Sequence, residues 1–193
     1  MTKLNDFRLV NDFEKSILVN TLREISHKSD ILLQKIQDSL YISFDRTSSK
    51  GQQPSIYLVP TNHANIIRKF ETDIQISSVG LYFGFIKKES FRLSLEGAEF
   101  LVNREYLSKD QILVIDSNGE KSVLYGNDIK KGNVINFPAN LRKGDFLVIN
   151  NVQNEICAIT QSLISKQDLT RVNSGDRIAL NLVDKGYYLR KRQ

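Results

Sequence analysis

Residues 111–132, QILVIDSNGEKSVLYGNDIKKG, decide the expected fold of the second half of this chain. Residues 112–115 are a short run of branched apolar side chains, which predicts a buried strand. Residues 116–119, DSNG, have the composition of a turn, and residues 120–125 would form about a turn and a half of helix. Gly126 stands where a helix end needs a residue that tolerates positive φ. The stretch therefore predicts strand, turn, short helix and glycine stop, followed by two lysines.

The composition is that of an ordinary globular protein. The chain has 193 residues, with 40% hydrophobic and 25% charged, so it can form one large or two small domains. No apolar run approaches the ~18 residues of a membrane span, and the N-terminus lacks the features of a signal peptide. The single cysteine, Cys157, can form neither an internal disulfide nor a zinc site by itself. We therefore expect an intracellular protein without a membrane partner, a metal or a cofactor.

Positive charge is concentrated in the second half. The net charge is +5 and the pI about 9.2. Residues 1–99 hold 13 Lys and Arg against 12 Asp and Glu, whereas residues 100–193 hold 14 against 10. A basic half is the electrostatic footprint of a nucleic-acid binder. Charge alone leaves open the alternative of a generally basic, solvated surface.

The first half predicts an α/β domain. Residues 11–26 predict an amphipathic helix that begins with a capping box. A polar segment near residue 104 marks the expected domain boundary. Before it, the order of expected elements is strands at 31–35, 39–45 and 55–59, a helix at 61–72, a glycine-interrupted hairpin over 79–95, and a short helix at 95–100.

Three motifs follow one another in the chain: the strand from Gly80 to Gly84 with FRL at 91–93, then LYGN at 124–127, then DKGYY at 184–188. In this order they resemble the Nip-seven family of ribosome-biogenesis factors. Members of that family join a pre-PUA α/β domain to a C-terminal PUA domain, a small β-barrel that holds structured RNA. The resemblance covers residues 79–193 and is weaker over 1–76. It implies an α+β or α/β domain at 1–104 followed by a small mixed β-barrel (PUA) domain at 105–193.

The resemblance also implies a function. Such a protein would be a non-catalytic RNA-binding factor for biogenesis of the large ribosomal subunit, in contact with rRNA, pre-rRNA or uridine-rich RNA. Other ribosome-assembly proteins would bind its N-terminal domain. The basic C-terminal end is typical of archaeal members, so we expect an archaeal, cytoplasmic protein, or a nucleolar one if the source is eukaryotic.

The predicted RNA contacts are basic residues of the second half and a tyrosine beside them. For each cation the alternative is a solvated surface charge, and for Tyr187 and Tyr125 it is packing in the core or rim of the barrel. Lys130 and Lys131, after the glycine stop, are reserve candidates. The predicted set is Arg190, Lys191, Arg192, Lys185, Lys166, Arg171, Arg177 and Tyr187.

Two other classes of function remain open. PUA domains also accompany RNA-modifying enzymes, so the chain could be such an enzyme or its accessory subunit. Asp45 is the only acid in a context faintly similar to that of a pseudouridine synthase, and we predict a strand-end role for it. His27 and His63 lack companion ligands, and Cys157 is expected to be a buried small hydrophobe. No catalytic or metal residue is therefore predicted. The third class is a protein-interaction adaptor that acts through its near-neutral N-terminal domain.

Overall fold

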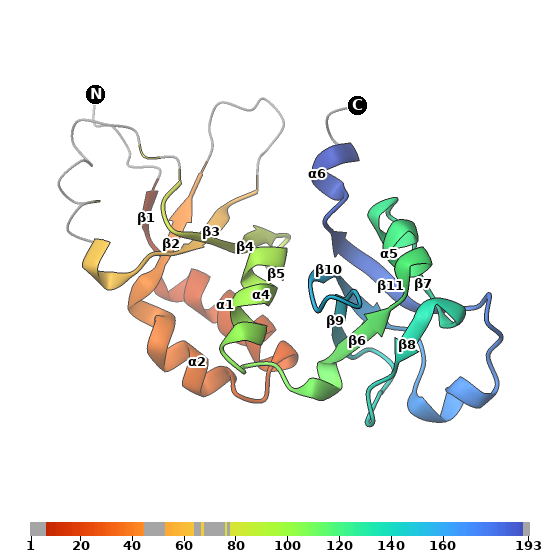
Figure 1. Cartoon of the computed structure of the whole chain (residues 1–193). Helices are drawn as coiled ribbons and strands as arrows, with labels where there is room; N and C mark the ends of the chain where they lie inside the picture. The colour runs from red at the N-terminus through yellow and green to blue at the C-terminus, as the bar shows by residue number, and fades with distance from the viewer. Residues whose placement is uncertain (1–6, 45–52, 64–66, 68–75, 77, 191–193) are drawn as a thin grey trace. The chain divides into compact units, whose positions relative to one another are not determined.

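The computed structural model of this chain describes residues 7–44, 53–63, 67, 76 and 78–190 (Figure 1). Contacts between residues divide the chain into two units, Met1–Phe100 and Leu101–Gln193, and each is described by itself. The domain boundary that we expect between residues 104 and 105 stays a prediction.

The N-terminal unit is an antiparallel sheet covered by helices. The strands follow one another in the sheet in chain order, from β1 to β5. Helix α1 contacts both α2 and β5. The strands are β1 (Phe7–Leu9), β2 (Leu40–Ser43), β3 (Ser55–Leu58), β4 (Leu81–Lys87) and β5 (Ser90–Leu93); the helices are α1 (Asp12–Ile25), α2 (Ser29–Ile36) and α4 (Leu95–Asn103), with short 3-10 turns at η1 (Gln37–Ser39) and η2 (Thr61–His63).

Helix α1 begins as its sequence predicts. The Glu14 backbone N–H donates to Asn11 Oδ1 at 2.8 Å, and the Asn11 N–H donates back to Glu14 Oε2 at 2.8 Å. This capping box satisfies two donors that a helix start otherwise leaves without partners. Leu18 and Leu22 are fully buried on the inner face. The predicted helix at 11–26 is confirmed.

The strand predicted at 31–35 is wrong, because these residues lie within helix α2. Ser29, Leu32 and Ile36 are buried, at spacings of three and four residues, while Ile31 is exposed. That is the period of a helix face and not of a strand. Three consecutive apolar residues, Ile-Leu-Leu, conceal this period over so short a window. The expected helix at 61–72 falls mostly outside the described residues, and so does Asp45.

The glycine-interrupted hairpin is confirmed. Gly84 in β4 pairs with Leu93 in β5. A Cβ atom on Gly84 would lie 2.1 Å from the carbonyl oxygen of Arg92, so the two backbones approach more closely than any side chain allows. Lys88 and Glu89 turn the hairpin with φ values of 48° and 58°.

The C-terminal unit is a mixed sheet that curls into a half-barrel (Figure 1). The strand order is β7-β11-β10-β9-β6-β8, in which β6 and β9 are parallel and the other pairs antiparallel. The predicted fold class is thereby confirmed. The strands are β6 (Ile112–Ile115), β7 (Ile129–Lys130), β8 (Val134–Asn136), β9 (Phe146–Asn150), β10 (Ile156–Ser162) and β11 (Arg177–Asp184); α5 (Ser117–Leu124), α6 (Tyr187–Arg190) and the 3-10 turns η3 (Lys109–Gln111), η4 (Lys131–Asn133) and η5 (Lys166–Thr170) connect them.

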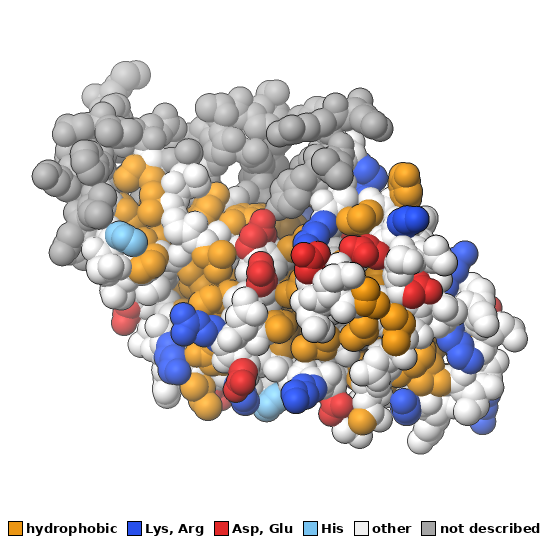
Figure 2. Space-filling model, viewed as in Figure 1, with side chains coloured by type: hydrophobic (Ala, Val, Ile, Leu, Met, Phe, Trp, Pro, Cys, Tyr) orange, Lys and Arg blue, Asp and Glu red, His pale blue; other side chains and the backbone are white. Residues whose placement is uncertain are grey.

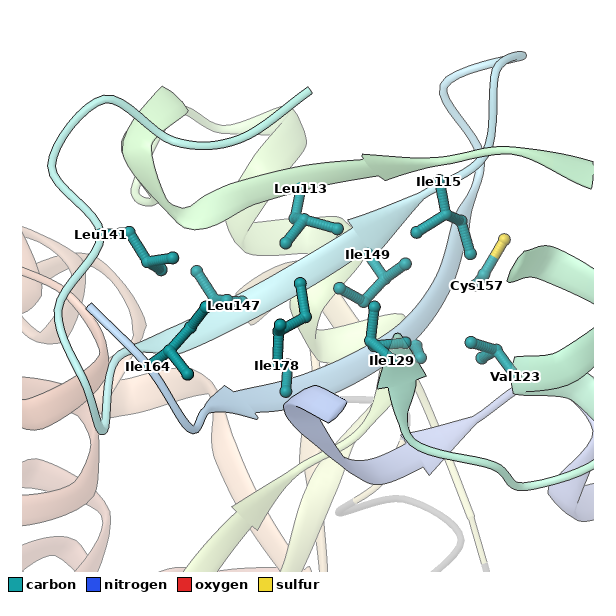
Figure 3. Packing of buried hydrophobic residues seen from close by; sticks show 12 residues of the cluster. Leu113, Ile115, Val123, Ile129, Leu141, Leu147, Ile149, Cys157, Ile164 and Ile178 are labelled. Carbon is teal, nitrogen blue, oxygen red and sulfur yellow. The ribbon is translucent and has the colours of Figure 1, made fainter. Parts of the chain in front are cut away.

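Branched aliphatic side chains fill the half-barrel (Figure 3). Ile115 and Ile149 are fully buried, and Ile178 is 1% exposed. Cys157 lies among them and is 1% exposed, as its apolar neighbours in the sequence predict. The predicted strand at 112–115 is confirmed as β6, whose parallel neighbour β9 lies more than 30 residues further along the chain.

Helix α5 starts earlier than predicted. Asp116 is its N-cap and accepts a hydrogen bond from the Gly119 N–H at 2.7 Å, so residues 117–119 form the first helical turn and not a separate turn. The same residue types serve both purposes, which explains the error. The helix ends where expected, with Tyr125 as C-cap and Gly126 at a φ of 85°.

Candidate nucleic-acid interface

A continuous polar network runs along β11. Arg177 Nη1 donates to Asp128 Oδ2 at 2.9 Å, and the Asn181 backbone N–H donates to Asp128 Oδ1 at 3.0 Å. The Asn181 side-chain amide donates to Asp184 at 3.2 Å, and the Arg190 guanidinium donates to both oxygens of Asp184 at 2.9 and 2.8 Å. Two predicted RNA-binding arginines, Arg177 and Arg190, are thus linked through three residues outside the predicted set of RNA contacts.

The network also closes the end of helix α5. The last carbonyl groups of a helix have no partner within the helix. Here the Asn181 amide donates to the carbonyls of Val123 and Asn127, at 3.4 and 3.2 Å, and Arg190 donates to the carbonyl of Leu124. A guanidinium at this point is also favoured by the negative end of the helix dipole.

Two glycines let the chain close around Arg190. A Cβ on Gly126 would lie 3.1 Å from the Arg190 guanidinium carbon, and a Cβ on Gly186 would lie 1.9 Å from the Leu124 carbonyl oxygen. The hydrogen bonds with Asp184, whose side chain is 5% exposed, raise the pKa of Arg190 above its ordinary value. Arg190 is therefore a permanently charged clamp between α6 and the end of α5.

A second set of basic residues lies at the other end of β11. Lys130 in β7 is the register partner of Arg177, which places the two residues side by side across the strands. The neighbouring Lys131 turns inward, since its Nζ donates to the carbonyls of Leu169 and Val172 at 2.8 Å each. Lys131 therefore holds η5 against β7, whereas Lys130 is exposed to solvent.

The remaining predicted cations differ in how they are placed relative to β11. Arg171 is exposed at the end of η5. Lys185 directly follows β11 and lies 3.9 Å from Glu155. Lys166 is turned elsewhere, with its Nζ 5.9 Å from the centre of the Phe137 ring.

Tyr187 is 44% exposed in α6. Lys191 and Arg192 lie outside the described residues. Asp128 and Asn181 have no local sequence signal, whereas Asp184 opens the DKGYY motif and could have been singled out.

Positive and negative side chains alternate on this unit. In the face drawn in Figure 2, its Lys and Arg side chains are spread between Asp and Glu side chains and do not form one uninterrupted patch. The Lys185 and Glu155 side chains are 49% and 62% exposed in their ion pair. Exposed pairs of this kind contribute little to stability, so Lys185 can exchange its carboxylate partner for a phosphate at little cost. Arg177 is also exposed, but its partner Asp128 is only 17% exposed, so loss of that ion pair costs more.

The N-terminal unit contains an apolar hollow. Its volume is about 680 Å³, and its walls include Leu58, Val59, Ile67, Val79 and Phe100. The described residues that line it include no Asp or Glu. Among the described residues, no three His, Cys, Asp or Glu side chains are grouped so that they could hold a metal ion. None of the helices in the described part of the chain has the length and apolar character that a membrane crossing requires.

Comparison with known proteins shows what the second unit resembles. Residues 111–193 match the family described as the UPF0113 PUA domain. Over these residues the C-terminal unit is similar to a UPF0113 PUA domain. A UPF0113 protein from Archaeoglobus fulgidus is 26% identical over 147 residues, which span 75% of this chain and 77% of that protein. A PUA domain suggests RNA binding.

Solved structures share the fold over nearly the whole chain. A conserved PUA domain protein from Thermoplasma acidophilum has a TM-score of 0.58 at 13% identity, with 96% of this chain and 98% of that chain covered. A PUA domain structure from Aeropyrum pernix has a TM-score of 0.62 at 11% identity, with 97% and 92% covered. At these identities the likeness concerns the fold alone.

Proposed function

We propose that this protein is a non-catalytic RNA-binding factor that acts in biogenesis of the large ribosomal subunit. The observation that carries the proposal is the match of residues 111–193 to a PUA domain. In this proposal the chain is of the Nip-seven type, with a pre-PUA domain at 1–104 and the RNA-binding domain at 105–193. Its ligand is rRNA, pre-rRNA or uridine-rich RNA, and its place is the cytoplasm. The archaeal relative supports an archaeal source.

Binding in this proposal depends on phosphate contacts from cations along β11 and beyond it. The predicted contacts are Arg177 and Lys185, which keep exposed side chains, together with Arg171, Lys191 and Arg192. Each phosphate that a cation neutralises releases counterions, so affinity falls with salt. Such contacts position the protein and carry little sequence information. Arg190 contributes indirectly, because its hydrogen bonds with Asp184 and the Leu124 carbonyl hold α6 at the end of α5. Lys166 contributes least to this surface, because its side chain lies against the Phe137 ring.

The proposal is tested with the full chain and a fluorescent uridine-rich single-stranded RNA. Phosphate contacts by these five cations predict a loss of about a hundredfold in affinity between 50 and 200 mM salt. Charge reversal at Lys191 and Arg192 should weaken binding and flatten this salt dependence. The matched control reverses Lys87 and Lys88, an exposed basic pair at the hairpin of the N-terminal unit. Absence of binding by the wild-type protein at 50 mM salt overturns the proposed function, and an unaffected tail variant rejects the tail as part of the site.

Catalysis is tested separately. RNA incubated with the protein is digested and its nucleosides are analysed by mass spectrometry. The proposal expects no new modified base with rRNA, transfer RNA or uridine-rich RNA. A modified product would instead support the RNA-modifying enzyme as the function.

The apolar hollow favours a second, compatible function as an adaptor. Val79 and Phe100 line a space that suits apolar side chains of another protein. In this proposal the partner is another ribosome-assembly protein that binds the N-terminal domain. The full-length Val79→Glu variant should lose co-purification of such proteins from cell extract while it keeps RNA affinity. Unchanged co-purification would exclude the hollow as the contact.

A further inference from the structure

Tyr125 is exposed to an unusual extent for its size. It is 79% exposed, which is the highest value among the large hydrophobic residues that the described part of the chain leaves exposed. Packing in the core or rim of the barrel, the alternative for this tyrosine, does not occur. A single exposed aromatic ring requires no explanation by itself. Tyr125 is a candidate ligand contact because hydrogen bonds also hold its backbone in place.

That backbone is held in one conformation. The Tyr125 N–H points at the carbonyls of Lys121 and Ser122, at 3.2 Å each, and the Gly126 N–H donates to Val123 at 2.8 Å. Gly126 continues the chain at a φ of 85°, with the Arg190 guanidinium against it. The base of the side chain is therefore fixed before any ligand arrives, which lowers the entropy lost on binding.

An exposed cation lies near the same position. Lys121 is one helical turn before Tyr125, and residues four apart lie on the same face of a helix. The Arg190 guanidinium lies against Gly126, the residue after Tyr125, where it is paired with Asp184. An exposed ring beside a cation is a combination with which proteins bind single-stranded nucleic acid, because the ring stacks on a base while the cation contacts the backbone.

We propose that Tyr125 stacks on an unpaired base of the bound RNA. This inference rests on the proposed RNA-binding function and adds to it a subsite for a nucleobase, in contrast to the phosphate contacts made by the basic residues. The clamp formed by Arg190 holds the backbone on either side of Tyr125, through Leu124 and Gly126. Sequence-independent stacking is available to every base, so Tyr125 distinguishes single-stranded from fully paired RNA.

The absence of tryptophan from the chain allows a direct test. The Tyr125→Trp variant carries a single tryptophan, whose fluorescence should be quenched when uridine-rich single-stranded RNA binds. The matched control is Phe13→Trp, because Phe13 is a 66% exposed aromatic residue of the N-terminal unit. An RNA of equal length with abasic sites keeps its phosphates and should cause little quenching. Equal quenching by the abasic RNA would refute stacking.

Affinity supplies the second readout. Tyr125→Ala should weaken binding of the single-stranded RNA about tenfold, an effect in the range for loss of one stacked base. Tyr125→Phe should bind like the wild type, and neither variant should change the salt dependence, because no charge is removed. If the wild type binds RNA but Tyr125→Ala binds equally well, the stacking proposal fails alone. If the wild type binds no RNA, both proposals fail.

Discussion

Replacing Gly186 by alanine should separate the C-terminal helix α6 from the end of α5. Gly186 lies between Asp184 and α6, where the chain passes directly over the last turn of α5. An added Cβ would stand 1.9 Å from the carbonyl oxygen of Leu124 and 2.7 Å from Arg190 Nη1. The first of these neighbours is backbone, which cannot rotate away.

The size of the effect follows from this distance. Ordinary contact begins near 3.4 Å, so the two segments must move apart by about 1.5 Å. The hydrogen bond from Arg190 to the Leu124 carbonyl cannot survive that displacement. Forcing an extra methyl into such a contact costs about 1–3 kcal/mol of unfolding free energy. For a domain of this size, each kcal/mol lowers the Tm by about 4–8 °C.

Gly175→Ala is the matched control, because a Cβ there would meet nothing within 4 Å. Both variants are unfolded by heat and by urea, and amide hydrogen exchange is followed at Arg190, whose N–H donates to the Gly186 carbonyl at 3.0 Å. Gly175→Ala should leave all three measurements at wild-type values. Gly186→Ala should lower the Tm and speed exchange at Arg190. If the two variants cannot be distinguished, the clamp between α6 and α5 does not exist as described.

Three further predictions concern other parts of the chain. Burial raises the pKa of Glu14, but hydrogen bonds and the charge of Arg8 outweigh burial, so the pKa lies below its ordinary value. Glu14→Gln should therefore destabilise the protein at pH 7, and urea titrations should show that the difference shrinks once the pH falls below the ordinary carboxyl pKa of about 4.3 and is lost below the lowered pKa of Glu14. Lys131→Met should lose about 1.5–3 kcal/mol with its two hydrogen bonds to carbonyls, whereas the exposed Lys130→Met should change urea stability by less than about 0.5 kcal/mol; equal losses would contradict the inward position of Lys131. Burial raises the pKa of the Cys157 thiol to about 11, so iodoacetamide at pH 8 should label it in urea but not in the folded protein, as measured by intact mass.

Local signals determined those parts of the fold in which the interacting groups lie within a few residues. Asn11 and Glu14 are three residues apart, so the start of α1 could be recognised without knowledge of any other segment. The same holds for Gly126, where the chain must adopt positive φ at a helix end. Helix α2 was misjudged because its apolar residues are too few and too close together to reveal a period.

The sequence predicted which residues belong to the candidate site but not which hydrogen bonds and ion pairs they form. The sequence shows that the second half is basic and that Arg177 and Arg190 belong to it, and their role in RNA binding stays a prediction. The sequence does not show which N–H groups of these two arginines already donate to acceptors within the protein. Arg190 meets Leu124 across 66 residues of sequence, and Arg177 meets Asp128 across 49.

The amino-acid sequence by itself determined the class of each half, the start of α1, the glycine after α5 and the sign of the charge, because these properties depend on residue type and on near neighbours. Only the tertiary structure decided that Arg190 and Lys131 turn inward and that Tyr125 faces solvent. The physical reason is that a long polar side chain can hydrogen-bond either to water or to a carbonyl or carboxylate that is distant in the sequence. The second kind of partner comes within reach only after the strands have paired.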